Sequence, residues 1–253
     1  MEPFRAALLE TALPAVRVLP KKVARADFWQ SKIGGEPFWP ADRPVPMDSR
    51  GGELFFLAQI NFREMPPLEN YPKNGLLQFW IADDDGFGLD FDNGENQADF
   101  RAVFFPNFDE KNVGDRRTDF SFLKKMEEMP IPAGATYLID FEEVTEIVPM
   151  TDYRFEQKFG ADFFKKFGDE EWDIQDELDE TLLAPGHKIG GYAHFTQEDP
   201  RSAEDPMLLL FQLDSDDEID CSWGDEGVAN FFIREKDLLA EGFSRVLFNW
   251  DCY

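Results

Sequence analysis

Two stretches of the sequence decide the fold: "KIGGEPFWP" at residues 32–40 and "KIGGYAHFT" at residues 188–196. They begin with the same four residues, and three further pairs of segments follow them in the same order. The pairs are "FFLAQI" (55–60) with "LLLFQL" (208–213), "GLLQFWI" (75–81) with "GVANFFI" (227–233), and "FRAVFF" (100–105) with "FSRVLF" (243–248). Repetition of several segments in one order predicts two copies of one structural unit.

The repeated segments are short runs of Phe, Leu, Ile and Val, separated by Gly, Pro, Asn and Asp, which is typical of buried strands joined by turns. We therefore expect an α+β fold, mostly antiparallel β, in which a duplicated β-rich unit packs into one compact body with peripheral helices. The sequence predicts a single domain over 1–253, with copies at about 15–110 and 136–253. The paired glycines of each "KIGG" predict a turn with positive φ, because no phosphate-binding glycine pattern surrounds them.

Apolar residues recur at helical spacing in four segments: 2–13, 119–129, 152–167 and 169–183. "FG" at 159–160 and at 167–168 is the expected stop of two of these helices. If 136–148 corresponds to 15–28, the second copy carries an inserted helical arm at 151–185.

The arm is the most acidic part of the chain, since eight of the twelve residues from Asp169 to Glu180 are acidic and none is basic. Ile174, Leu178 and Leu182 would form an apolar stripe against the body. The acidic residues are a solvated helix face or, alternatively, a docking surface for a basic partner. They are Asp169, Glu170, Glu171, Asp173, Asp176, Glu177, Asp179 and Glu180.

The whole chain has 52 acidic and 25 basic residues, a formal net charge of −27. Such a charge repels nucleic-acid phosphates and anionic lipids and attracts basic proteins, although it also serves simply to keep a chain with 27 Phe in solution. The start of the chain lacks the pattern of a signal peptide, and no apolar run approaches about 18 residues, so we expect a cytoplasmic protein with no membrane partner. Two cysteines, Cys221 and Cys252, are too few for a disulfide framework.

Carboxylates alternate in "LDSDDEIDCSWGDEG" (213–227), and Asp214, Asp216 and Glu218 would share one face if the segment were extended. They are the candidate metal ligands, although the spacing does not match a calcium loop of the EF-hand type. The histidines and cysteines lack the close spacing of a zinc site. The sequence predicts no cofactor.

No nucleophile motif is present, and we assign no catalytic residue. A cleft between the copies is the default ligand site. Its candidate lining residues are Gln197, Arg201, Trp223, Asp225 and Asn230. Alternatively these residues are structural, with Arg201 paired to Asp225 inside the fold.

"HKIGGYAHFTQEDPR" (187–201), "LLLFQLDSD" (208–216), "WGDEGVANFFI" (223–233) and the terminal "NWDCY" closely resemble the YwqG-like family of uncharacterised bacterial proteins, as do "KIGGEPFWP", "FLAQINF" and "GLLQFW" in the first half. The resemblance implies no established reaction. Members have been suggested to act as immunity proteins, so it favours a non-enzymatic protein-binding module that neutralises a basic toxin. The alternative is a small-molecule or cation-dependent enzyme or binder that uses the cleft between the copies.

Overall fold

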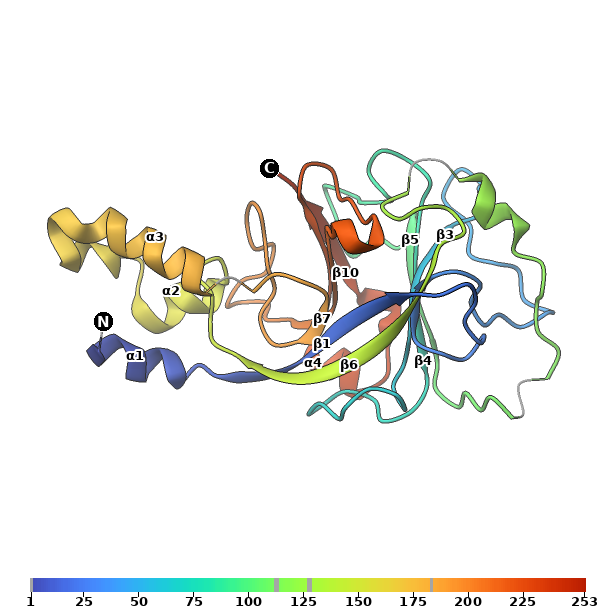
Figure 1. Cartoon of the computed structure of the whole chain (residues 1–253), viewed down its shortest axis with the longest axis horizontal. Helices are drawn as coiled ribbons and strands as arrows, with labels where there is room; N and C mark the ends of the chain where they lie inside the picture. The colour runs from blue at the N-terminus through green and yellow to red at the C-terminus, as the bar shows by residue number, and fades with distance from the viewer. Residues whose placement is uncertain (1, 112–113, 127–128, 183) are drawn as a thin grey trace.

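Ten strands form one antiparallel sheet in the computed structural model, which describes residues 2–111, 114–126, 129–182 and 184–253 (Figure 1). The strands are β1 (Leu13–Lys22), β2 (Lys32–Gly34), β3 (Phe55–Asn61), β4 (Leu76–Ile81), β5 (Phe100–Phe105), β6 (Thr136–Glu146), β7 (Lys188–Gly190), β8 (Leu208–Asp214), β9 (Val228–Ile233) and β10 (Leu247–Asp251). The sheet curls into a nearly closed barrel, and the predicted α+β class with mostly antiparallel strands is confirmed.

The order of the strands has an internal symmetry. It runs β10-β9-β8-β7-β1-β6-β2-β3-β4-β5, so that the long strands β1 and β6 form the centre and each side continues with four strands in the same sequence. β1 pairs with β7, and β6 pairs with β2. The first strand of each half is therefore hydrogen-bonded to the second strand of the other half.

The register of these pairs fixes which residues are equivalent. Ala15 lies opposite Gly190, and Thr136 lies opposite Gly34. Because Gly34 and Gly190 occupy the same place in the two "KIGG" segments, Ala15 and Thr136 are equivalent. The same register shift, one residue after the start of the strand, also occurs in both β3 and β8.

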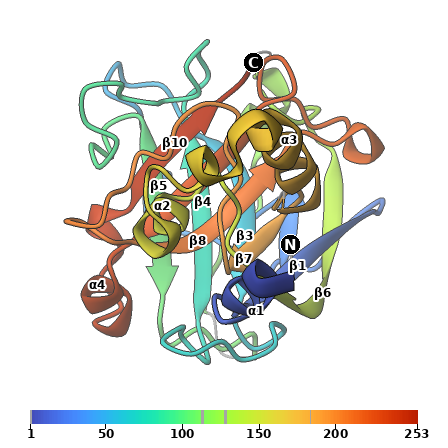
Figure 2. The ribbon, with the colours of Figure 1, turned by 90° about the vertical axis from the view of Figure 1, so that its left-hand side faces the viewer.

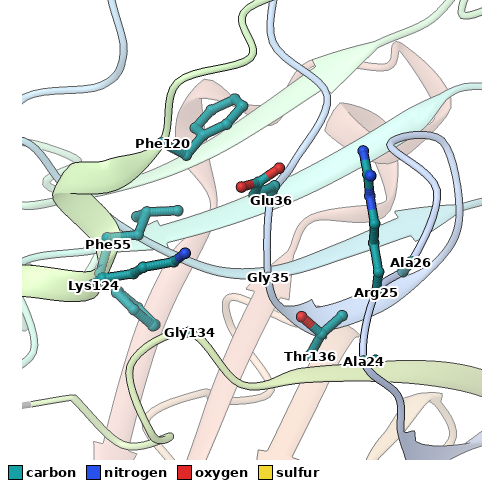
Figure 3. Close-up of a pocket in the computed structure, with 11 residues that line it drawn as sticks. Ala24, Arg25, Ala26, Gly35, Glu36, Phe55, Phe120, Lys124, Gly134 and Thr136 are labelled. Atoms are coloured by element: carbon teal, nitrogen blue, oxygen red, sulfur yellow. The ribbon is translucent and has the colours of Figure 1, made fainter.

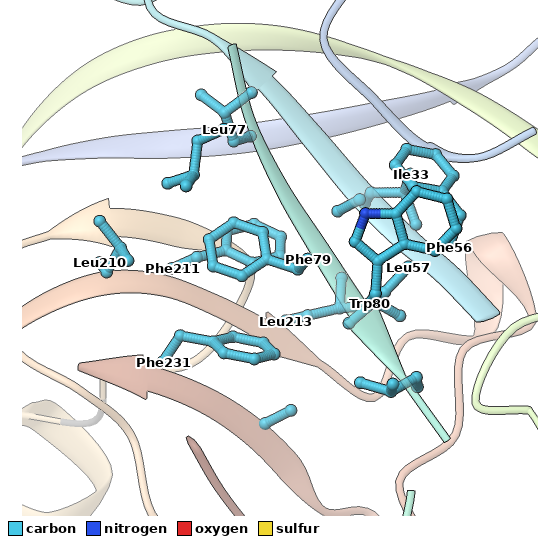
Figure 4. Close-up of a cluster of buried hydrophobic side chains, with 14 of the residues drawn as sticks. Ile33, Phe56, Leu57, Leu77, Phe79, Trp80, Leu210, Phe211, Leu213 and Phe231 are labelled. Carbon is cyan, nitrogen blue, oxygen red and sulfur yellow. The ribbon is translucent and has the colours of Figure 1, made fainter. Parts of the chain in front are cut away.

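The core lies between the two halves of the curled sheet, where strands rich in Phe and Leu face one another (Figure 4). Phe79 on β4 and Phe231 on β9 hold equivalent positions, and their ring centroids are 4.5 Å apart. Phe211 on β8 stacks on Phe79 at 5.1 Å. Burial of such rings removes a large apolar area from water and accounts for the unbroken apolar character of these strands.

Two buried glutamines repeat one hydrogen-bonding scheme, and each ties a loop to the sheet. Gln59 Oε1 accepts from the backbone N–H of Phe38, and Gln212 Oε1 accepts from that of His194. Their amide groups each donate to two carbonyls of a preceding loop, those of Phe28 and Gln30 in the first half and those of Ala184 and Gly186 in the second. A buried amide is stable only when its donors and acceptors are paired, so these contacts fix both loops.

The helices are peripheral: α1 (Glu2–Leu9), α2 (Tyr153–Phe159), α3 (Glu171–Leu182), α4 (Glu235–Leu239), and the short 3-10 helices η1 (Ser121–Lys125), η2 (Phe164–Glu170), η3 (Asp217–Ile219) and η4 (Phe243–Arg245). α1, α2 and α3 cover one end of the barrel and pack on one another (Figures 1 and 2). Across the part of the chain described here, no helix is long and apolar enough to cross a membrane.

The predicted glycine stops in the arm are confirmed, since α2 ends at Gly160 with φ 87° and Gly168 with φ 60° interrupts the helical backbone within η2, shortly before α3 begins at Glu171. The predicted apolar stripe of the arm is also confirmed, because Leu178 and Leu182 are buried against α1 and α2. The helix expected at 119–129 is wrong. Among the described residues of this segment only the 3-10 helix η1 forms, because the backbone is already extended at Met126.

A candidate ligand pocket and an acidic arm

A cavity of about 310 Å³ lies where the first half of the chain meets the start of β6 (Figure 3). Gly35 and Glu36 follow β2 and form one wall, and Gly134, just before β6, and Thr136, its first residue, form another. Arg25, just after β1, completes the rim. The cavity is formed mainly by the first copy and the segment that follows it, and among its lining residues only Thr136 belongs to the second copy. None of the five residues expected to line a cleft between the copies lies here.

Three charged side chains line the cavity without forming ion pairs with described residues. Arg25, Lys124 and Glu36 are exposed, and none of them forms an ion pair or a side-chain hydrogen bond with another described residue. In Figure 3 the Lys124 and Arg25 side chains lie on opposite sides of the cavity, with the Glu36 carboxylate between them. On a chain of net charge −27, two cations without a carboxylate partner are available to an anionic group.

The inner wall of the cavity is apolar. Phe55 on β3, Phe120, and Leu123 on η1 are buried in the core and also line the cavity. Apolar walls with a few converging polar groups are the usual composition of a small-molecule site.

The chain can pass close to β6 only because it has glycines at this turn. Gly34 and Gly35 have φ values of +65° and +71°, and a Cβ on Gly35 would lie 2.6 Å from Thr136 Oγ1. Gly190 and Gly191 have similar positive φ values. The prediction that the paired glycines make a turn with positive φ is confirmed.

Behind the Glu36 wall lies a buried lysine that sequence reasoning missed. Lys32 Nζ donates to the carbonyl oxygens of Asp27 at 2.7 Å and Glu36 at 2.9 Å, and the side chain is inaccessible to water. Burial lowers the pKa of Lys32 to about 7, against the opposing effect of nearby carboxylates, chiefly that of Asp27. Its signal in the sequence is a lysine repeated at the start of two apolar strands.

The equivalent lysine, Lys188, has a different partner. Its Nζ lies 2.8 Å from Glu146 Oε1, and burial lowers its pKa although Glu146 opposes the change. A second cavity of about 300 Å³ adjoins this pair and is lined by both side chains and by His187.

His187 is held as a neutral ring. The backbone N–H of Asp214 donates to Nδ1 at 3.0 Å, and Nε2 lies 3.1 Å from Asp216 Oδ2, so the remaining proton belongs on Nε2. Burial lowers the pKa of His187, which the neighbouring Asp216 only partly offsets. Ser31 makes the equivalent contact with Asn61 in the first half, which points to a structural role for this position.

The predicted ligand residues do not converge on the cavity of Figure 3. Arg201 is buried and bonds to Asp152 and Asp199 at 2.8 and 2.9 Å, so the expected pairing with Asp225 is wrong. The reason is that the 199–201 turn faces the start of α2, where Asp152 caps the helix.

The other four occupy separate places in the fold. Trp223 is part of the core, and Asn230 donates from its buried amide to the carbonyl of His194. Gln197 is exposed and donates to the carbonyl of Cys252, while the carbonyl of exposed Asp225 accepts from the N–H of Tyr253.

The condition for the candidate metal ligands to share one face is not met, because the chain leaves β8 after Asp214 and turns into η3 instead of staying extended. Asp214 accepts from the N–H of Gly186, Asp216 caps η3 by accepting from the N–H of Glu218, and the side chain of Glu218 faces solvent. Among the residues with described side chains, no group of three or more His, Cys, Asp or Glu could hold a metal ion.

The acidic arm projects at the end of the molecule (Figure 1). We use "acidic arm" for Asp169–Glu180, which spans the end of η2 and most of α3. Four side chains of the arm are exposed, those of Asp169, Glu170, Asp173 and Asp176, and the side chain of Glu171 is partly exposed. None of these five carboxylates forms an ion pair with a described residue. Trp172 is 73% exposed between them. The side chains of Glu177, Asp179 and Glu180 lie outside the part that the structure describes.

Comparison with known proteins places the chain in a family. The sequence profile of the family described as "Domain of unknown function (DUF1963)" matches residues 31–252. No curated protein matches the chain in sequence. The more specific resemblance to YwqG-like proteins stays a prediction. Because the match spans both halves of the sheet, from β2 to the end of β10, the chain belongs to the DUF1963 family.

Proposed function

We propose that this chain is a non-enzymatic binding protein that captures a basic protein through its acidic arm. One observation carries the proposal: an exposed tryptophan, Trp172, stands among carboxylates without ion-pair partners on a helix whose other face is packed on the body. An aromatic anchor inside a charged rim is the composition of a binding hot spot, and tryptophan is the residue most enriched there.

The charge of the chain favours the same partner class. A net charge of −27 raises the rate of encounter with a basic protein and disfavours acidic competitors. By the family resemblance, we propose that the partner is a basic toxin and that the chain acts as its immunity protein in the cytoplasm. Binding would then cover the basic surface of the toxin without any chemical step.

The test begins with capture from a lysate of the producing cells at low salt and identification of the retained protein. The dissociation constant of the purified pair is then measured between about 50 and 300 mM salt, over which exposed charges are progressively screened. A variant with Glu170→Gln, Asp173→Asn and Asp176→Asn should bind about tenfold more weakly, and Trp172→Ala should weaken binding at least as much.

The matched control carries Glu69→Gln, Glu198→Gln and Glu204→Gln, three exposed carboxylates outside the arm that also lack ion pairs with described residues. It changes the net charge equally, so it should weaken binding only about twofold. Equal losses in both triple variants, or affinity that does not respond to salt, would contradict the role of the arm.

A second candidate function is the binding of a small molecule in the cavity of Figure 3. The observation that favours it is the set of three charged side chains, Arg25, Glu36 and Lys124, that face an apolar wall without ion pairs to described residues. A ligand that supplies those partners would raise the thermal midpoint of unfolding. A panel of small anions, zwitterions, sugars and divalent cations tests this candidate, and no shift with any of them would count against it.

A further inference from the structure

The two halves of the chain carry side chains of opposite charge at one equivalent position. Ala15 and Thr136 are equivalent, so ten residues further on Arg25 corresponds to Glu146. The surroundings agree, because Glu146 lies opposite Leu13 on β1, and Gly134, the counterpart of Leu13, lines the cavity beside Arg25.

Glu146 folds its carboxylate over the glycine turn of the second half. Oε2 accepts from the backbone N–H of Tyr192 at 3.0 Å, and Oε1 accepts from Lys188 Nζ at 2.8 Å. A Cβ on Gly191 would lie only 2.4 Å from Oε2. The carboxylate therefore fills the space directly above the second glycine of the "KIGG" segment.

In the first half the same space has no carboxylate. Gly35 and Glu36, the counterparts of Gly191 and Tyr192, both face the cavity, and the backbone N–H of Glu36 has no acceptor among the described residues. Thr136 takes part of the space and directs its hydroxyl oxygen toward Gly35. An arginine, Arg25, stands where the second half has its glutamate.

The ligand class follows from this comparison, and it rests on the second candidate function proposed above. We infer that the first half binds the carboxylate of a ligand where the second half binds its own Glu146, with the Glu36 N–H and the Thr136 hydroxyl as donors and Arg25 or Lys124 as the cation. Charge-assisted hydrogen bonds of this kind are the strong ones.

Glu36 narrows the class further, because its side-chain carboxylate shares the cavity with the two cations. It repels a ligand that is only anionic and pairs with an ammonium group. The apolar wall of Phe55, Phe120 and Leu123 takes an apolar side chain. A free α-amino acid with an apolar side chain satisfies all three parts of the cavity.

The test is binding of phenylalanine to the full chain. The dissociation constant is measured by titration calorimetry, and the change in the thermal midpoint of unfolding is measured separately. Phenylalaninamide lacks the carboxylate and should bind at least about tenfold more weakly, as expected for the loss of a charge-assisted bond. N-acetylphenylalanine lacks the ammonium group and should also bind more weakly. N-acetylphenylalanine resembles the C-terminal residue of a peptide. If the natural ligand were a peptide C-terminus, N-acetylphenylalanine would bind as tightly as phenylalanine.

Arg25→Glu is the decisive variant, because it gives the first half the carboxylate that Glu146 supplies in the second. It should abolish phenylalanine binding while the protein stays folded. The control is Lys73→Glu, the same charge reversal at an exposed lysine outside the cavity, and it should leave binding unchanged.

Phenylalaninamide that binds as tightly as phenylalanine, or an Arg25→Glu variant that binds normally, would overturn the inference. If another class of the panel binds and phenylalanine does not, the carboxylate inference fails while the small-molecule function stands. If nothing binds, both fail. Capture of a basic protein by the acidic arm is measured separately and depends on neither result.

Discussion

The pH dependence of stability provides the sharpest test of how Lys32 is buried. Its pKa is lowered to about 7 in the folded chain, against 10.5 for an unperturbed lysine. Between these two values the unfolded chain binds a proton that the folded chain does not, so the free energy of unfolding rises with pH. The contribution is complete above the unfolded pKa and is lost as pH falls through the folded pKa.

The size of the effect follows from the same shift. One proton changes the free energy of unfolding by about 1.4 kcal/mol per pH unit, and the whole shift corresponds to an upper bound of about 5 kcal/mol. We expect the free energy of unfolding of the wild type, minus that of Lys32→Met, to rise by about 1 kcal/mol per pH unit between about pH 7.5 and 9.5. Methionine has a similar length and no charge, so the cost of leaving two carbonyl oxygens unpaired does not change with pH.

Urea unfolding at about pH 7.5, 8.5 and 9.5 measures this difference. Subtracting the variant removes the contributions of other titrating groups, among them Lys188. Lys73→Met serves as the control, because Lys73 is exposed and its difference from wild type should be flat. A flat difference for Lys32→Met as well, or one that falls with pH, would refute a buried amine with a lowered pKa.

Three further substitutions test the interior. Arg201→Met removes a partner of two buried carboxylates and should cost about 3 to 5 kcal/mol of unfolding free energy, whereas Arg50→Met at an exposed arginine should have a much smaller effect. Gln59→Leu leaves buried backbone carbonyl groups without hydrogen-bond donors and should lower the free energy of unfolding by about 2 to 4 kcal/mol. Gly191→Ala, which meets Glu146, should cost about 3 kcal/mol or more, against about 1 to 2 kcal/mol for Gly51→Ala, where φ is also positive but the space is open.

Urea or thermal unfolding gives all these values. Equal losses at Arg201 and Arg50 would mean that the buried cluster is not tightly bound. Equal losses at Gly191 and Gly51 would mean that Glu146 moves away freely, which would also weaken the comparison behind the proposed carboxylate site.

The fold could be predicted from the sequence because its evidence is local and repeated. The strands β3, β4, β8 and β9 are short apolar runs bounded by turn residues, and Gly160 and Gly168 interrupt helical segments where the sequence breaks their pattern. The prediction of a helix at 119–129 was wrong because apolar spacing does not distinguish a short 3-10 helix from a full α-helix.

The site could not be predicted in the same way, because its parts come together only through the pairing of distant strands. Gly35 meets Thr136 across the junction of the two halves, and Arg201 meets Asp152 across a turn and a helix start. Lys32 and Lys188 were within reach of sequence reasoning. A lysine repeated at the start of two apolar strands indicates burial of its side chain.

The crossed pairing of β1 with β7 and of β6 with β2 has a consequence for the chain as it leaves the ribosome. β1 cannot complete its hydrogen bonds until synthesis has reached Gly190, where β7 ends. Until then the apolar side chains of Val16 and Val18 lie on a strand whose edge is open, and open edges promote pairing with other chains. Synthesis of this protein therefore includes a long interval of exposure, during which a chaperone that binds extended apolar segments would have its clearest target in the first copy.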